Sequence, residues 1–323
     1  MKTLSEERVR DPSFFGAGPA LASEDHLVRW GNGMSIQKVT LPIGEEDGLS
    51  MDAAEARSLG DLLHEEYVSA EPYPHIVLDE ILPRDLAQRV LRNFPLQPLA
   101  SDTVFNINYG GHLKRQIAPE DCSGFVRELF RFFNSKAMLA FLEGLSGIEG
   151  LLPDPYFEGG GFHEISAGGK LGVHADFRIH EKLHLQRRLN LLIYLNEDWD
   201  DRWNGRLELW DRQMQHCVKA VSPVMNRCVV FNTDADSYHG HPDPLGTPPE
   251  IKRRSIALYY YTASKAVYRE VPNLSTMYRA RPHDPASIRR EAASFRATEY
   301  FKDFAPPVLF RLVEKIRWRL SSR

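Results

Sequence analysis

The stretch Gly168–Phe177, GGKLGVHADF, decides how the rest of the chain is interpreted. Successive side chains of a β-strand point to opposite faces, so His174 and Asp176, two residues apart, project from one face. Such an imidazole and carboxylate supply two of the three ligands of the facial triad that binds non-haem Fe(II) and leaves coordination positions open. An H-x-D triplet equally fits a surface turn, so the downstream sequence has to discriminate between these alternatives.

Four segments follow in a defined order: Arg187–Trp199 (RRLNLLIYLNEDW), Asn204–Trp210 (NGRLELW), Asn226–Pro242 (NRCVVFNTDADSYHGHP) and Lys252–Thr262 (KRRSIALYYYT). With these segments, residues from about 72 to 264 resemble a 2-oxoglutarate/Fe(II)-dependent oxygenase of the prolyl-4-hydroxylase-like family. In that family H-x-D lies on an early core strand, a second histidine follows some tens of residues later, and a basic residue on the last core strand binds the far carboxylate of 2-oxoglutarate. The resemblance implies that His174, Asp176 and His239 bind Fe(II) and that Arg253, with Ser255, binds 2-oxoglutarate.

Two of these assignments have a rival nearby. His241 competes with His239, and the short polar-His-Gly segment of the resembling families favours His239. Arg254 competes with Arg253, because the loop before them is longer than is typical of the superfamily. Strand alternation places Arg253 and Ser255 on one face and Arg254 on the other. A guanidinium suits the task because its planar fork binds a carboxylate with two hydrogen bonds.

Further contacts follow from the resemblance, each with a structural alternative. Tyr194 stands where oxygen-sensing prolyl hydroxylases place a tyrosine hydroxyl on the 2-oxoglutarate carboxylate, and a core tyrosine is the alternative. His163 lies on the strand that precedes the ligands and is expected near iron or 2-oxoglutarate, or else as a structural histidine. The loop 177–187 follows Asp176 directly and is expected over the mouth of the site. Its substrate-binding candidates, which an exposed loop would explain equally well, are Arg178, His180 and His184.

The implied fold is α+β: a double-stranded β-helix (jelly roll, cupin-like) core that helices buttress on one face. Residue patterns predict helices over 51–68, from Asp85 onward, within 122–148 and over 285–303, and a strand over 75–78. The apolar run 189–195 predicts a strand buried on both faces, with Arg188, Asn190, Leu192 and Tyr194 on one side. Asn204-Gly205 predicts a two-residue hairpin turn. Residues 1–70 are expected to form an N-terminal extension packing on the core, 71–264 the jelly-roll domain, and 265–323 a C-terminal helical extension.

Composition sets the remaining expectations. A net charge of −4 argues against a nucleic-acid partner. Cys122, Cys217 and Cys228 have no metal-site spacing and suggest no disulfide framework, which favours the cytoplasm. We expect no transmembrane segment, because no run approaches the ~20 apolar residues of a membrane span. A homodimer is left open. The basic amphipathic helix predicted over 307–323 suits capping of its own domain, or docking on a membrane or partner.

The function implied by the resemblance is that of a dioxygenase that uses Fe(II), O₂ and 2-oxoglutarate as co-substrate, with ascorbate as a reductant. It would hydroxylate an unactivated C–H bond of a prolyl residue or a proline-like amino acid and release succinate and CO₂. Asp176 favours hydroxylation over chlorination, because the related halogenases lack this carboxylate. The alternatives are a hydroxylase of a small biosynthetic metabolite, a non-catalytic cupin-like metal-binding module, which would not need Arg253 with Ser255, and an interaction protein anchored by residues 307–323.

Overall fold

The computed structural model describes residues 27–28, 36–263 and 276–304. The predicted helices and the strand over 75–78 are present, with ends shifted by a few residues at most. The helices are α1 (Ala53–Ser69), α2 (Arg84–Arg92), α3 (Gly124–Phe133), α4 (Lys136–Ser146) and α5 (Ala286–Phe304), with 3₁₀ turns at Pro119–Asp121 and Asp201–Trp203. The strands are β1 (Leu27–Val28), β2 (Ile36–Lys38), β3 (His75–Asp79), β4 (Thr103–Ile107), β5 (Gly111–Ile117), β6 (Leu152–Pro153), β7 (Gly161–Ala175), β8 (Gln186–Tyr194), β9 (Leu207–Trp210), β10 (Cys217–Val221), β11 (Cys228–Asn232), β12 (His239–His241), β13 (Arg253–Thr262) and β14 (Met277–Tyr278).

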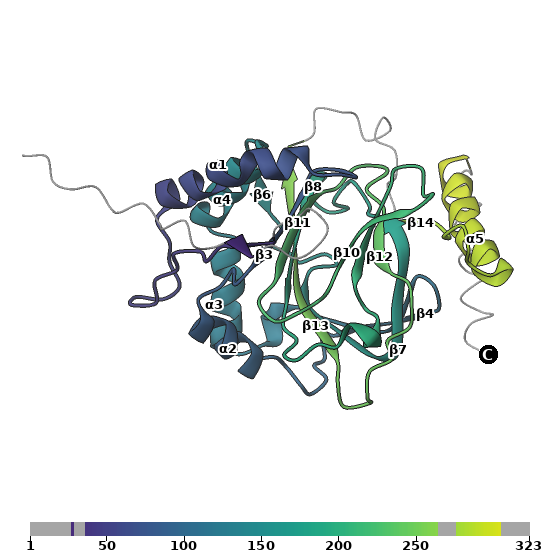
Figure 1. Cartoon of the computed structure of the whole chain (residues 1–323), viewed down its shortest axis with the longest axis horizontal. Coiled ribbons are helices and arrows are strands. Elements are labelled where there is room, and N and C mark those ends of the chain that lie inside the picture. The colour runs from purple at the N-terminus through teal and green to yellow at the C-terminus, as the bar shows by residue number, and fades with distance from the viewer. Residues whose placement is uncertain (1–26, 29–35, 264–275, 305–323) are drawn as a thin grey trace, which may run out of the picture.

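The strands form one curled sheet in the order β1-β2-β3-β11-β8-β13-β7-β12-β9-β10, which folds over on itself at β7 (Figure 1). We call β1, β2, β3, β11, β8 and β13, together with the first half of β7, the major sheet. The second half of β7 with β12, β9 and β10 is the minor sheet. Strand β5 pairs with the first half of β7 and β14 with the second half. Neighbouring strands are antiparallel apart from β2 and β3. This arrangement is the predicted α+β double-stranded β-helix.

Strand β7 connects the two sheets and carries the sequence motif. Its first half pairs with β13, where Ile165 lies opposite Arg253, and its second half pairs with β12, where His174 lies opposite His239. Between the halves the chain turns at Gly168, whose φ of 77° favours glycine. The bend therefore brings residues of the last core strand and of the metal-binding motif to the two walls of one interior.

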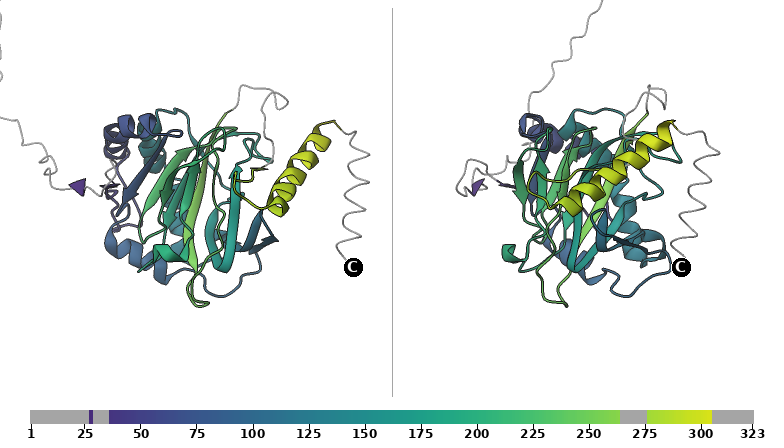
Figure 2. Two further views of the ribbon diagram at one scale, coloured as in Figure 1. Left: turned by 45° about the vertical axis from the view of Figure 1, so that its right-hand side comes forward. Right: turned by 90° about the vertical axis from the view of Figure 1, so that its right-hand side faces the viewer.

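Strand β8 is buried on both faces, as its apolar run predicts. Leu191 and Ile193 pack outward in the large core formed with α1 to α4. Leu192 and Tyr194 point inward, toward Leu207 and the other apolar residues between the two sheets. Helices α1 to α4 cover the outer face of the major sheet, whereas α5 lies at the other side of the molecule beside the minor sheet (Figure 2). The helical layer thus packs on the outer face of the major sheet, and the inner face is available to form the site.

The Asn204-Gly205 pair does not make the predicted hairpin. Both residues have positive φ, 62° and 76°, as such a turn requires, but β8 pairs with β11 and β13 while β9 pairs with β10 and β12. The prediction was wrong because local backbone preference does not specify which strands pair. The turn instead carries the chain from the major to the minor sheet. A side chain at Gly205 would place its Cβ 2.6 Å from Leu245 Cδ2, so the close approach requires glycine.

The termini extend past the described residues. The predicted helix 307–323 lies outside them, as does most of the stretch before residue 36. Within the described part, α1 contributes Ala56, Leu63 and Tyr67 to the same core as the major sheet. The division into three regions stays a prediction. No helix among the described residues is both long enough and apolar enough to cross a membrane.

Candidate active site

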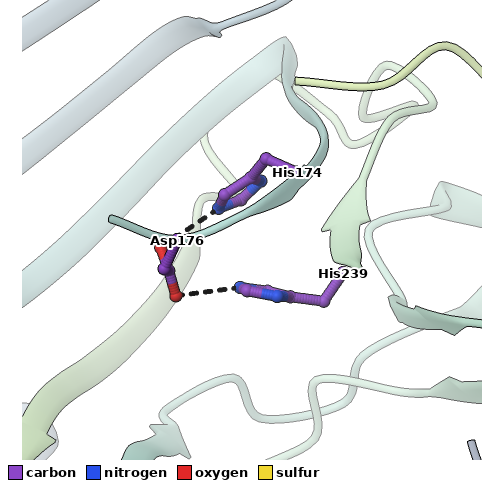
Figure 3. Close-up of side chains that lie close together, drawn as sticks. All are labelled: His174, Asp176 and His239. Atoms are coloured by element: carbon purple, nitrogen blue, oxygen red, sulfur yellow. Dashed lines mark ion pairs between the residues drawn. The ribbon is translucent and has the colours of Figure 1, made fainter. Parts of the chain in front are cut away.

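Three predicted metal ligands converge between the sheets. One ligand atom each from His174, Asp176 and His239 lies within 4.8 Å of the others. Asp176 faces both rings: its Oδ1 lies 3.5 Å from His174 Nε2, and its Oδ2 lies 3.5 Å from His239 Nε2 (Figure 3). The two histidines are directly opposite each other on neighbouring antiparallel strands, which explains why they share a face. All three residues are buried.

The hydrogen bonds of the two histidines use Nδ1 of each ring and leave Nε2 available to a metal. His174 donates from Nδ1 to the Gly172 carbonyl at 2.8 Å, and His239 donates from Nδ1 to the Ser237 carbonyl at 2.9 Å. Each Nε2 is then an acceptor that points at Asp176. Burial lowers the pKa of His239 to about 4, so its ring is neutral at pH 7. Two imidazoles and one carboxylate form the donor set that suits Fe(II).

Two polar residues of β8 hold the Asp176 carboxylate. Asn190 donates from Nδ2 to Asp176 Oδ2 at 2.7 Å, and the Arg187 guanidinium lies 3.1 Å from the same oxygen. Arg187 also donates to Asn190 Oδ1 and stacks over the Tyr259 ring, with its Cζ 3.5 Å from the ring centre. Burial by itself would raise the pKa of Asp176, but the Arg187 guanidinium holds it well below the usual range. The carboxylate is therefore ionised and fixed in orientation.

Sequence reasoning missed Arg187 because β8 does not alternate regularly at its start. Leu189 pairs with Tyr260, but the next pair is Arg187 with Tyr261, so Arg188 is an extra residue on this strand. Such a bulge reverses the alternation. The prediction that Arg188 shares the face of Asn190 was therefore wrong. Arg187 points to the metal ligands instead. Two adjacent arginines before an apolar run were the available signal, but they did not say which one turns inward.

A second group of predicted residues lies along the major sheet. Tyr194, Ser255 and His163 are neighbours on three adjacent strands, and Ser255 and His163 line the cavity that contains the metal ligands. Arg253 is buried, donates from Nε to the Gly205 carbonyl at 2.7 Å, and has its Nη2 3.4 Å from the Tyr194 hydroxyl. Arg253 lines the cavity and Tyr194 lies beside it, so the two offer hydrogen-bond donors in an arrangement suited to a carboxylate.

The rival residues lie elsewhere. Arg254 points to the outer face, where it donates to Glu164 at 3.0 Å and lies over the Phe94 ring. His241 is not part of the triad, although it is buried and lines the same cavity. Among the described residues, neither ring nitrogen of His241 has a hydrogen-bond partner.

The loop candidates are not brought together with the triad. His180 is fully buried and donates to Asp154 at 3.1 Å, while its Nδ1 accepts from the backbone of Lys182 and Leu183. Its hydrogen bonds stabilise the loop, and without exposed surface it is not placed to contact a substrate. Arg178 is half-buried, and His184 is exposed with a φ of 53°. For these two the substrate role stays a prediction.

Residues 160–261 match the model of the 2OG-Fe(II) oxygenase superfamily. This segment of the chain is therefore similar to the 2-oxoglutarate/Fe(II) oxygenases. The matched segment contains all the metal ligands as well as Tyr194, Arg253 and Ser255. The oxygenase is thus a 2-oxoglutarate- and Fe(II)-dependent dioxygenase, and the donor set described above fits that metal. The same match disfavours the alternative of a non-catalytic, cupin-like module that binds a metal without 2-oxoglutarate.

Several solved structures resemble the oxygenase. A prolyl-4-hydroxylase of Pseudomonas putida is 17% identical, with 64% of this chain and 100% of that chain covered and a TM-score of 0.46. A prolyl hydroxylase of Trichoplax adhaerens was solved with a hypoxia inducible factor oxygen degradation domain peptide. It is 16% identical, with 64% of this chain and 91% of that chain covered and a TM-score of 0.44. HygX of Streptomyces hygroscopicus was solved with nickel, 2-oxoglutarate and hygromycin B. It is 11% identical, with 58% of this chain and 82% of that chain covered and a TM-score of 0.41. No curated protein sequence matches the chain.

Proposed function

We propose that this oxygenase hydroxylates an unactivated C–H bond, with release of succinate and CO₂. The observation that carries the proposal is the joint presence, in one cavity, of the complete His174, Asp176 and His239 set and the buried Arg253 beside Tyr194. Fe(II) and 2-oxoglutarate bound there would supply the oxidation of the substrate by O₂. A halogenase needs the position that Asp176 takes, so the carboxylate supports hydroxylation.

The chain's own residues have separate tasks in this reaction. His174, Asp176 and His239 would hold the metal, and Asn190 with Arg187 keeps the carboxylate in place. Arg253 would bind the far carboxylate of 2-oxoglutarate, and Tyr194 and Ser255 lie beside it. Leu192 and Leu207 also line the cavity and give it apolar surface.

The proposed substrate is a prolyl residue or a proline-like amino acid, and the alternative is a small biosynthetic metabolite. The prolyl class rests on the resemblance in sequence alone. The proposal includes ascorbate as the reductant that keeps iron in the ferrous state. It also includes a cytoplasmic location, which the three free cysteines support. Whether the enzyme acts as a homodimer stays open.

Succinate release and oxygen transfer test this function together. Protein loaded anaerobically with Fe(II) is given 2-oxoglutarate and O₂, alone and with a panel of prolyl peptides, free amino acids and biosynthetic metabolites. We expect one class to stimulate succinate formation and to gain one oxygen atom by mass, and both effects to be lost in Asp176→Ala. Stimulated succinate formation with another change in the substrate would overturn the hydroxylase assignment. Binding of Fe(II) without binding of 2-oxoglutarate would favour the metal-only module.

A further inference from the structure

Lys114 of β5 brings a further cation to the cavity, on the other side of β7 from the strand that carries Arg253. It pairs with Ile165 of β7, and Ile165 pairs on its other side with Arg253 of β13. Directly opposed residues of adjacent strands share a face, so the three side chains form one row that points into the interior. Lys114, Ile165 and Arg253 all line the cavity that contains the metal ligands. Lys114 lies outside the residues that match the superfamily.

The ammonium group of Lys114 has no hydrogen-bond or ion-pair partner among the described residues. Its Nζ lies over the Phe105 ring, 4.9 Å from the ring centre. Burial lowers the pKa of Lys114 to about 8; of the charges acting on it, Asp176 has the largest effect, ahead of Arg253 and Arg187. The group is therefore cationic at pH 7, and the metal-binding carboxylate is the charge that acts on it most strongly. Lys114 is half-buried, and an unpaired cation that lines a cavity points to an anion that binds there.

The charges of the loaded site show which anion remains to be supplied. Fe(II) and the doubly charged 2-oxoglutarate cancel each other. Asp176 then balances one of three cations, Arg187, Arg253 and Lys114. Arg187 already contacts Asp176, and Arg253 lies beside Tyr194 at the proposed 2-oxoglutarate end. The loaded site therefore keeps two net positive charges, and Lys114 is the cation for which the described residues supply no anionic partner.

We propose that Lys114 binds an acid group of the primary substrate, so that the substrate is a carboxylate-bearing small molecule. The proposal rests on the proposed function and narrows it: a free amino acid or another small acid fits Lys114, whereas a prolyl residue within a peptide brings no charge of its own. The same carboxylate chemistry could come from 2-oxoglutarate itself, and the experiments separate the two sources.

The first experiment measures 2-oxoglutarate binding by calorimetry on Mn(II)-loaded protein, with Mn(II) as the redox-inert substitute for Fe(II). Lys114→Met keeps the length of the side chain and removes its charge, and Lys136→Met, at the exposed start of α4, is the matched control. We expect both to bind within about threefold of the wild type, and Arg253→Met to bind about 30-fold more weakly. A loss in Lys114→Met comparable to that in Arg253→Met would overturn the proposal, because Lys114 would then bind the co-substrate.

The second experiment uses bromide as a small anion probe. Crystals of the protein loaded with Mn(II) and 2-oxoglutarate are soaked in bromide, and its anomalous signal is located. We expect a bromide ion in contact with Lys114 Nζ in the wild type and in Lys136→Met, and none there in Lys114→Met. Absence of bromide at Lys114, or a peak that persists in Lys114→Met as an adventitious ion only, would overturn the proposal. If the wild type binds no 2-oxoglutarate, the proposed function fails instead, and calorimetry shows this before any soak.

Discussion

The two walls of the cavity differ in how their residues reach it. On the minor-sheet wall, His174 and Asp176 are two residues apart on one strand end, and His239 comes from the strand paired beside them. On the major-sheet wall, Arg187 reaches Asp176 only through a bulge in β8, and Lys114 enters only because β5 joins the edge of β7. Metal ligands follow from local alternation, whereas the groups that surround them depend on long-range pairing. Variants on the two walls should therefore fail in different ways.

The largest effect is expected on the minor-sheet wall. His174→Ala removes one of three ligands, so Fe(II) binding and succinate formation should both fall by about 100-fold or more. Metal binding is measured by calorimetry with Mn(II), and turnover by succinate release. The control is His216→Ala, whose side chain is 69% exposed and lies away from the triad. Full activity of His174→Ala would contradict the metal assignment.

The next effect compares two adjacent arginines of β13. Arg253→Ala removes a buried guanidinium that faces Tyr194, so the apparent KM for 2-oxoglutarate should rise about 30-fold or more. Arg254→Ala removes only the outward contact with Glu164, so the same KM should stay within about threefold. Steady-state kinetics on both variants measures the ratio. A larger effect at Arg254 would mean that the strand has the opposite register in solution.

These two adjacent arginines show what sequence alone could provide. Alternation along an uninterrupted strand correctly predicts that Arg253 faces inward and Arg254 outward. It fails at Arg187 and Arg188, because one extra residue in β8 reverses the faces and nothing in the apolar run marks it. It fails at Asn204-Gly205 as well, where both φ values are positive as predicted, but the ψ of −148° at Asn204 and the partners of the flanking strands are not those of the predicted hairpin. The sequence did not indicate Lys114, because β5 is a polar strand. Its pairing with β7 depends on tertiary structure, which the local sequence does not specify.

A third prediction tests whether Arg187 acts through Asp176. Arg187→Met leaves a buried carboxylate without its cation, so the metal-free protein should lose about 3 kcal/mol of its free energy of unfolding. Bound metal supplies the missing positive charge, so the Mn(II)-loaded variant should lose less. Thermal unfolding with and without Mn(II) measures both, and the rise in Tm on loading should be larger in the variant than in the wild type. Equal losses in the two states would mean that Arg187 contributes only packing, such as its stacking on Tyr259.

The smallest effect is expected in the helical layer, which supports the major sheet from outside the cavity. Asp52 accepts hydrogen bonds from the backbone of Ala54 and Glu55, both at 2.9 Å, and so caps the N-terminus of α1. Asp52→Ala should lower the free energy of unfolding by about 1 kcal/mol, and Asp52→Asn, which keeps the acceptor, should restore most of it. Chemical denaturation measures the loss. Because α1 packs behind the sheet and lines none of the cavity, the affinity for 2-oxoglutarate should not change in either variant. A changed affinity would mean that the helical layer affects the geometry of the site as well as the stability of the fold. The site would then depend on the helices in addition to its two walls.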